Sequence, residues 1–129
     1  LMTWARRARP EEQALLTGAT ESIARELKVD VAPVGVAWQE TRRRWPEIEL
    51  YVADGSHPSE AGTYLAASVL YAFLTRQSPL GAATTITGHP YARREGTVDL
   101  SKTVALATLG PDVAGKLQAV AWEIGRGRR

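Results

Sequence analysis

The stretch Asp54–Ala67 reads DGSHPSEAGTYLAA, a polar turn that leads directly into an apolar helix. Asp54-Gly55 favours a turn, and Pro58-Ser59 stands where a helix can begin. Apolar residues recur at helical spacing from Tyr64 to Leu74. They predict a helix over about 59–76 that is buried over most of its circumference, and therefore a rigid mount for the turn.

Asp54 and His57 are the strongest candidates for chemistry, because they have the spacing of a catalytic acid and its base. A catalytic histidine needs one nitrogen free to take a proton, while the other donates to a carboxylate that fixes its tautomer. An aspartate three residues upstream, across a glycine turn, can fold back onto the imidazole. The same spacing also arises by chance, so a purely structural turn stays open, and Ser56 is most simply a turn hydroxyl.

Upstream of this turn, the sequence predicts a strand–helix–strand unit. Residues 1–4 have the apolar character of the end of a strand, and a proline with two glutamates at 10–12 indicates the start of a helix. Periodicity predicts a helix over 10–28, and the β-branched run 29–34 predicts a strand that ends near Pro33. This order of elements favours parallel pairing of the two strands.

The remaining elements follow from breaks in the pattern. We expect a second helix over 36–45, an extended segment over 47–52 and a loop over 78–98. We further expect a short helix over 101–109, with Ser101 as its cap, and a last helix from Asp112 to about Ile124. Residues 1–125 are predicted to form a single domain, followed by a disordered basic tail at 126–129.

Composition excludes several classes of protein. No apolar run approaches the roughly 18 residues of a membrane span, and the absence of cysteine excludes disulfides and thiolate chemistry. The two histidines and scattered acids lack metal-ligand spacing, and His89 is expected to be a surface loop residue. The apolar start at Leu1 indicates a strand already under way, so any targeting segment would lie upstream and the cellular location stays open.

Arginines form clusters at 6–9, 42–44, 93–94 and 126–129, although the net charge is only +2. Nucleic-acid binding would require these clusters to converge on one face. Glutamates stand beside several of them, which favours solvated faces and no nucleic-acid partner. The nucleic-acid alternative predicts strongly salt-dependent retention on polyanions.

Residues 54–67 resemble the last conserved block of the SGNH (GDSL-like) serine ester hydrolases. In that family an Asp-x-x-His supplies the acid and base of the triad just before the final helix. The continuation Gly62–Ala67, the run Ala32–Trp38 and the opening Met2–Ala5 are similar to one bacterial branch of the family. The resemblance extends from residue 1 to about residue 81.

This resemblance implies the C-terminal part of a three-layer α/β/α sandwich with a parallel sheet. It also implies acyl-ester hydrolysis without metal or cofactor, in which His57 is the base and Asp54 orients it. The implied substrate is a small ester, such as an acylated carbohydrate or a lipid. Trp38 and Gly35 follow a predicted strand and are candidates for lining the substrate pocket, although core packing is an equal alternative for Trp38. Exported or periplasmic location is common among such proteins.

The sequence departs from the family in lacking a Gly-Asp-Ser nucleophile block and any asparagine for an oxyanion hole. No serine lies in a nucleophile-like context: Ser22, Ser56, Ser59, Ser68, Ser78 and Ser101. The chain alone is therefore expected to be inactive, and to need the missing N-terminal half or another chain to complete the site. The alternative hypothesis is a truncated, non-catalytic hydrolase remnant that acts as a binding or interaction module.

Overall fold

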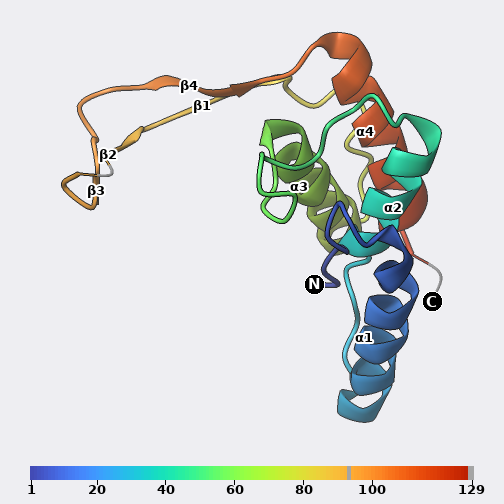
Figure 1. Cartoon of the computed structure of the whole chain (residues 1–129). Coiled ribbons are helices and arrows are strands. Elements are labelled where there is room, and N and C mark those ends of the chain that lie inside the picture. The colour runs from blue at the N-terminus through green and yellow to red at the C-terminus, as the bar shows by residue number, and fades with distance from the viewer. Residues whose placement is uncertain (93, 128–129) are drawn as a thin grey trace.

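The computed structural model describes residues 1–92 and 94–127, and shows a helical body from which a β arm projects (Figure 1). The helices of the body are α1 (Gln13–Leu27), preceded by the short 3-10 helix η1 (Pro10–Glu12), α2 (Val34–Arg44), α3 (Glu60–Thr75) and α4 (Pro111–Gly125). The sequence predicted each of these helices, with boundaries that differ by one to a few residues.

The hydrophobic core lies where α2, α3 and α4 pack together (Figure 1). Leu65 and Val69 of α3 and Leu117 of α4 are all 0 % exposed. Burial of each such side chain contributes about 1.5–3 kcal/mol to stability. The helices approach closely at Gly125, where an added Cβ would stand 3.0 Å from the Val69 carbonyl oxygen.

One face of α3 is open, contrary to the prediction that the helix is buried over most of its circumference. Leu74 is 72 % exposed and Tyr71 is 43 % exposed, and Ala67 also faces solvent. The reason is that α2 and α4 cover the helix from one side only. The open face borders a groove that is described with the site below.

The expected three-layer α/β/α sandwich with a parallel sheet is wrong, because the described strands pair antiparallel in two separate two-stranded sheets. Residues 1–4 and 29–34 do lie side by side. The Met2 amide donates to Ala32 O at 2.9 Å, and the Gly35 amide donates to Met2 O at 3.1 Å. No ladder continues, because Pro33 has no N–H and the Val34 amide turns back onto Ala32 O at 3.0 Å, which leads the chain into α2.

The arm consists of strands in the region predicted as a loop and a short helix. Strand β1 (Thr85–Gly88) pairs with β4 (Val104–Thr108), and β2 (Tyr91–Ala92) pairs with β3 (Thr97–Val98) at the far end (Figure 1). The predicted loop over 78–98 is therefore wrong in part, because β1, β2 and β3 lie within it. The predicted helix over 101–109, with Ser101 as its cap, is wrong, because residues 104–108 form strand β4. Larger side chains alternate with alanines in β4 (Val-Ala-Leu-Ala-Thr), a pattern that suits a strand once β1 lies beside it.

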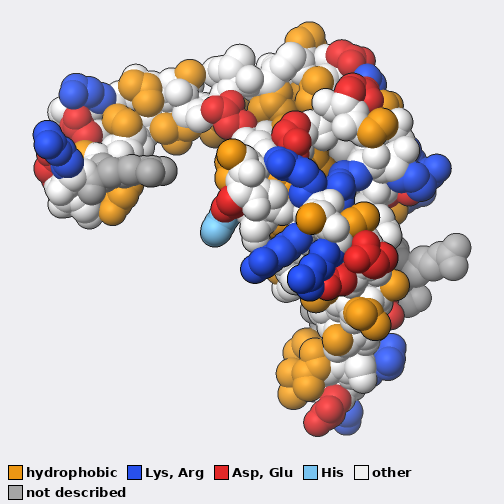
Figure 2. Space-filling view, in the orientation of Figure 1, with side chains coloured by type: hydrophobic (Ala, Val, Ile, Leu, Met, Phe, Trp, Pro, Cys, Tyr) orange, Lys and Arg blue, Asp and Glu red, His pale blue; other side chains and the backbone are white. Residues whose placement is uncertain are grey.

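The surface of the arm is notably apolar, and Figure 2 shows hydrophobic side chains along it. Tyr91 is 59 % exposed, Leu100 74 % and Leu106 48 %. The same view shows the basic side chains of the body lying among acidic ones. Among the described residues, no helix combines the length and apolar character needed to cross a bilayer. Of the predicted basic tail, residues 128–129 lie outside the described part of the chain.

Candidate functional site

Asp54 and His57 meet side chain to side chain in an exposed turn between α2 and α3. The Asp54 Oδ2 atom lies 2.5 Å from His57 Nδ1. The other carboxylate oxygen, Oδ1, accepts from the Ser56 amide at 2.8 Å and from the His57 amide at 2.9 Å. Because an ionised carboxylate can only accept, Nδ1 carries the proton and Nε2 is left as the acceptor. We call these two residues the Asp–His pair.

The charge of Asp54 is stabilised by the same contacts. The hydrogen bond from His57, followed by the backbone amides of Ser56 and His57, holds the pKa of the Asp54 carboxyl well below its ordinary range. Asp54 is therefore ionised at neutral pH and able to stabilise an imidazolium. The His57 side chain is 78 % exposed, so its Nε2 atom is open to a reacting group.

Several backbone contacts hold the turn against the body. Gly55 has φ +67°, a left-handed conformation that glycine adopts without strain, and its carbonyl accepts from the Arg7 amide at 2.8 Å. The Trp4 indole N–H donates to Ser56 O at 3.0 Å. The Val52 amide donates to His57 O at 3.0 Å. Residues that precede α1, Trp4 and Arg7, thus help to fix the position of His57.

Ser59 connects the turn to α3 and has no free role as a nucleophile. Its hydroxyl donates to Glu49 O at 2.8 Å and accepts from the Gly62 amide at 3.1 Å, which caps the first turn of the helix. Among the described residues, no serine hydroxyl forms a hydrogen bond with the His57 imidazole.

Trp38 and Gly35, the predicted pocket residues, lie in the interior of the body. Trp38 is 1 % exposed and stacks on Trp4 with ring centroids 4.1 Å apart. Since the Trp4 indole bonds to the turn, Trp38 supports the Asp–His pair through one intermediate residue. Gly35 is buried beneath Thr3, where an added Cβ would stand 1.9 Å from the carbonyl oxygen. Its role is a close backbone approach, and its predicted contact with substrate stays a prediction.

His89 lies on the arm, between β1 and β2, and forms no hydrogen bond with the Asp–His pair. It is exposed, as expected, and its Nδ1 lies 2.7 Å from the carbonyl oxygen of Lys102. The described residues contain no group of three or more histidines and acids placed to hold a metal ion. The structure therefore brings together two of the four predicted site residues, Asp54 and His57.

Two cavities are present that sequence patterns did not reveal, and the first of them reaches the turn at Pro58. The apolar groove, of about 970 Å³, lies between α3, the loop after it and the base of the arm. Its lining includes Val52, Pro58, Tyr64, Ala67, Tyr71, Leu80, Ile86 and Leu106. The arginine pocket, of about 400 Å³, is lined by Arg7, Trp38, Arg42, Arg43, Glu49 and Tyr51, among others. Both cavities join residues from distant segments, which explains why no local pattern marks them.

Comparison with protein-family models, with curated proteins and with solved structures found no match for this chain. The site itself combines an ionised carboxylate, an oriented and exposed imidazole, and an apolar groove whose lining begins at Pro58, the residue after His57.

Replacing Asp54 with asparagine should lower thermal stability at neutral pH, but not in strong acid. A carboxyl with a lowered pKa in the folded state contributes stability that is fully present above its unfolded pKa, about 3.9. That contribution is lost as the pH falls below this value and through the lower folded pKa. Thermal unfolding followed by circular dichroism from about pH 7 to pH 2 should show the midpoints of wild type and Asp54→Asn converging. A constant difference would contradict the assigned contacts.

Proposed function

We propose that this chain supplies the general base and its orienting acid for hydrolysis of acyl esters. The observation that carries the proposal is the 2.5 Å contact between Asp54 Oδ2 and His57 Nδ1, in a turn that leaves Nε2 exposed. The nucleophile would be a serine on polypeptide outside these 129 residues, as the resemblance of residues 54–67 to SGNH hydrolases implies. The proposal depends on the pair and not on a parallel sheet, which the described residues do not form.

The roles of the two residues follow from the tautomer. His57 Nε2 would take the proton of the serine hydroxyl as the oxygen attacks the ester carbonyl. The imidazolium would then return that proton to the leaving alcohol, and a water molecule would release the acyl group with the same base. Asp54 remains ionised throughout and stabilises the imidazolium.

The apolar groove supports an ester with an apolar chain as the substrate. Val52 and Pro58 line it, and Pro58 directly follows the base in the sequence. The Val52 amide also bonds to the His57 carbonyl, so one end of the groove is tied to the turn. A chain lying along Tyr64, Tyr71 and Leu106 would be removed from water, which favours binding in proportion to its apolar area.

The direct test begins with the gene upstream of the Leu1 codon. We expect an apolar strand ending in Gly-Asp-Ser, followed by glycine and asparagine blocks. The protein that includes this segment should hydrolyse p-nitrophenyl esters and react with a fluorophosphonate, which labels activated serines. An upstream region without such a serine, or a longer protein inert toward a series of esters, would contradict the proposal.

Filling the apolar groove should change chain-length selectivity. In the protein that includes the upstream segment, Ala67→Trp places a large side chain on the open face of α3. We expect kcat/KM for p-nitrophenyl decanoate to fall by about tenfold or more, while that for the acetate stays within about twofold. Ala119→Trp, on an exposed position of α4, is the matched control. Equal losses for both esters would indicate that the groove does not bind the chain.

A further inference from the structure

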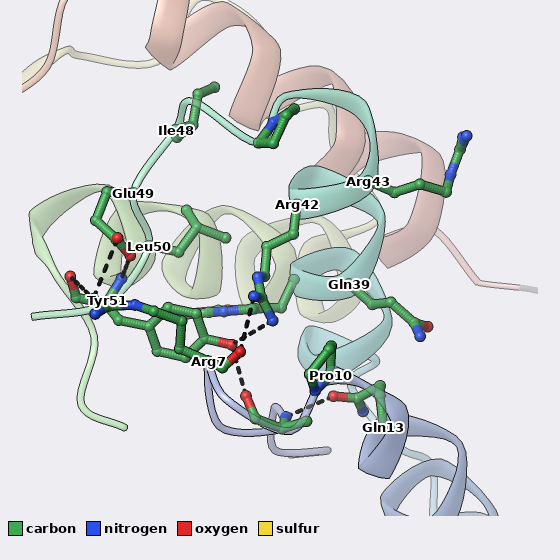
Figure 3. A pocket seen from close by; sticks show the side chains of 13 residues that line it. Arg7, Pro10, Gln13, Gln39, Arg42, Arg43, Ile48, Glu49, Leu50 and Tyr51 are labelled. Carbon is green, nitrogen blue, oxygen red and sulfur yellow. Dashed lines mark hydrogen bonds and ion pairs between the residues drawn. The ribbon is translucent and has the colours of Figure 1, made fainter. Parts of the chain in front are cut away.

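Among the residues that the structure describes, no carboxylate neutralises the Arg42 cation in the arginine pocket. In Figure 3 the Arg42 side chain runs from α2 toward Tyr51 and Arg7, whereas the Arg43 side chain points away from them. The Arg42 guanidinium carbon lies 5.2 Å from the centroid of the Tyr51 ring. Its Nη2 donates to the Arg7 carbonyl at 3.1 Å, and its Nη1 lies 3.4 Å from the Tyr51 hydroxyl.

The neighbouring arginines all have acidic partners. Arg7 pairs with Glu49 at 3.2 Å, and Arg43 pairs with Glu40 at 2.7 Å. Arg44 pairs with Glu40 of the same helix, and it also pairs with Glu123 of α4 at 2.8 Å. Within the described residues, Arg42 forms no ion pair, although it is half-buried. The lining of the pocket thus keeps one positive charge in a partly desolvated position, where charge interactions are stronger than in water.

Two further donors in the lining lack a well-formed hydrogen bond. The indole Nε1 of Trp38 and the Nε of Arg7 are buried without a partner of hydrogen-bond geometry in the described part of the chain, although the Trp38 N–H lies close enough to the Tyr51 hydroxyl to act on its pKa. Buried donors are almost always satisfied, and an unpaired one has a substantial free-energy cost. A net cation with two unpaired N–H groups beside it has the chemistry that recognises an anion, because each of these groups can only donate.

We propose that the arginine pocket binds a small anion, a carboxylate or a phosphate group, with the Arg42 guanidinium as its principal ligand. Trp38 Nε1 and Arg7 Nε supply additional hydrogen bonds after small shifts of the side chains. The volume of about 400 Å³ also leaves room for an organic group attached to the anion.

This site is distinct from the Asp–His pair and is connected to it through the backbone. The Arg7 amide donates to the Gly55 carbonyl in the turn, so the residue that lines the pocket also positions the turn. A bound anion would accept a hydrogen bond from the Arg7 side chain, while the backbone amide of Arg7 remains bonded to the Gly55 carbonyl. The pocket does not include His57, and anion binding requires no serine, so its test is independent of ester hydrolysis.

The test is a titration of the full chain, labelled with nitrogen-15, with inorganic phosphate and separately with acetate, at ionic strength matched with sodium chloride. We expect saturable shifts of the Trp38 indole signal, identified by its loss in Trp38→Phe. The stronger of the two anions identifies the ligand class. Chloride should leave the signal unchanged.

Arg42→Gln should weaken the binding of the preferred anion by about tenfold or more, whereas Arg43→Gln should change it by less than about twofold. Arg43 is the matched control, since it is adjacent on α2 and its guanidinium points away. If circular dichroism shows that the glutamine variant is misfolded, Arg42→Lys, which keeps the charge, tests the site instead. Arg42→Lys should bind the anion more weakly than wild type but more tightly than Arg42→Met. Equal losses in the Arg42 and Arg43 variants, or no saturable shift with either anion, would overturn the proposal.

Discussion

Replacing His57 with alanine should lower kcat for ester hydrolysis by about four to six orders of magnitude in the protein that includes the nucleophile. The reason is geometric: the Asp54 contact at Nδ1 leaves Nε2 as the acceptor for the serine proton. Without the imidazole, neither activation of the serine nor protonation of the leaving alcohol has a catalyst. Steady-state kinetics with a p-nitrophenyl ester measure the loss.

His89→Ala provides a matched control for this experiment. It removes the other histidine, which lies on the arm and contacts the Lys102 carbonyl, so activity should remain within about twofold of wild type. Asp54→Ala should lower kcat by a smaller factor than His57→Ala, about 10⁴, because the imidazole remains but its orientation is lost. Activity in His57→Ala equal to that of wild type would eliminate the Asp–His pair as catalytic groups.

Gly35→Ala should destabilise the fold by about 3 kcal/mol or more. The added Cβ would stand 1.9 Å from the Thr3 carbonyl oxygen and 2.5 Å from Gln13 Nε2, so the backbone before α1 would have to move. That movement would also break the bond from the Gly35 amide to Met2 O. The change in the free energy of unfolding can be measured by urea titration followed by circular dichroism.

Gly18→Ala is the contrasting substitution. Gly18 lies within α1, and an added Cβ there meets nothing within 4 Å. Because alanine restricts the unfolded chain and favours the helix, the variant should gain about 0.5–1 kcal/mol. If both glycine variants changed the free energy of unfolding alike, the close approach of Gly35 to Thr3 would be refuted.

The Asp–His pair could be predicted from the sequence because all of its geometry is local. Asp54 and His57 are three residues apart, Gly55 permits the left-handed turn between them, and Ser59 caps the helix that follows. Turn and capping preferences act within a few residues, so they can be predicted from a single sequence. The positions of α1, α3 and α4 were predictable from apolar spacing, which is also local. The position of α2 was predictable from Pro46, which ends the helix before it.

The strands were not predictable to the same extent. Val104–Thr108 has apolar residues that suit either a helix or a strand. Its partner strand, Thr85–Gly88, lies about twenty residues earlier in the sequence. Conversely, residues 1–4 and 29–34 have strand-like composition but form only isolated backbone bonds, because Pro33 interrupts the ladder. Strand pairing depends on a partner that the segment itself does not specify.

The sequence alone therefore determined the helices of the body and the turn that holds the Asp–His pair, since both arise from contacts between residues a few positions apart. Only the tertiary structure decided that no parallel sheet forms in the described chain, that the segment after α3 becomes an arm, and that Trp38 and Gly35 lie in the interior. The apolar groove and the unneutralised Arg42 likewise depend on segments distant in sequence, whose contacts are set by packing and by the pairing of charges across the whole fold.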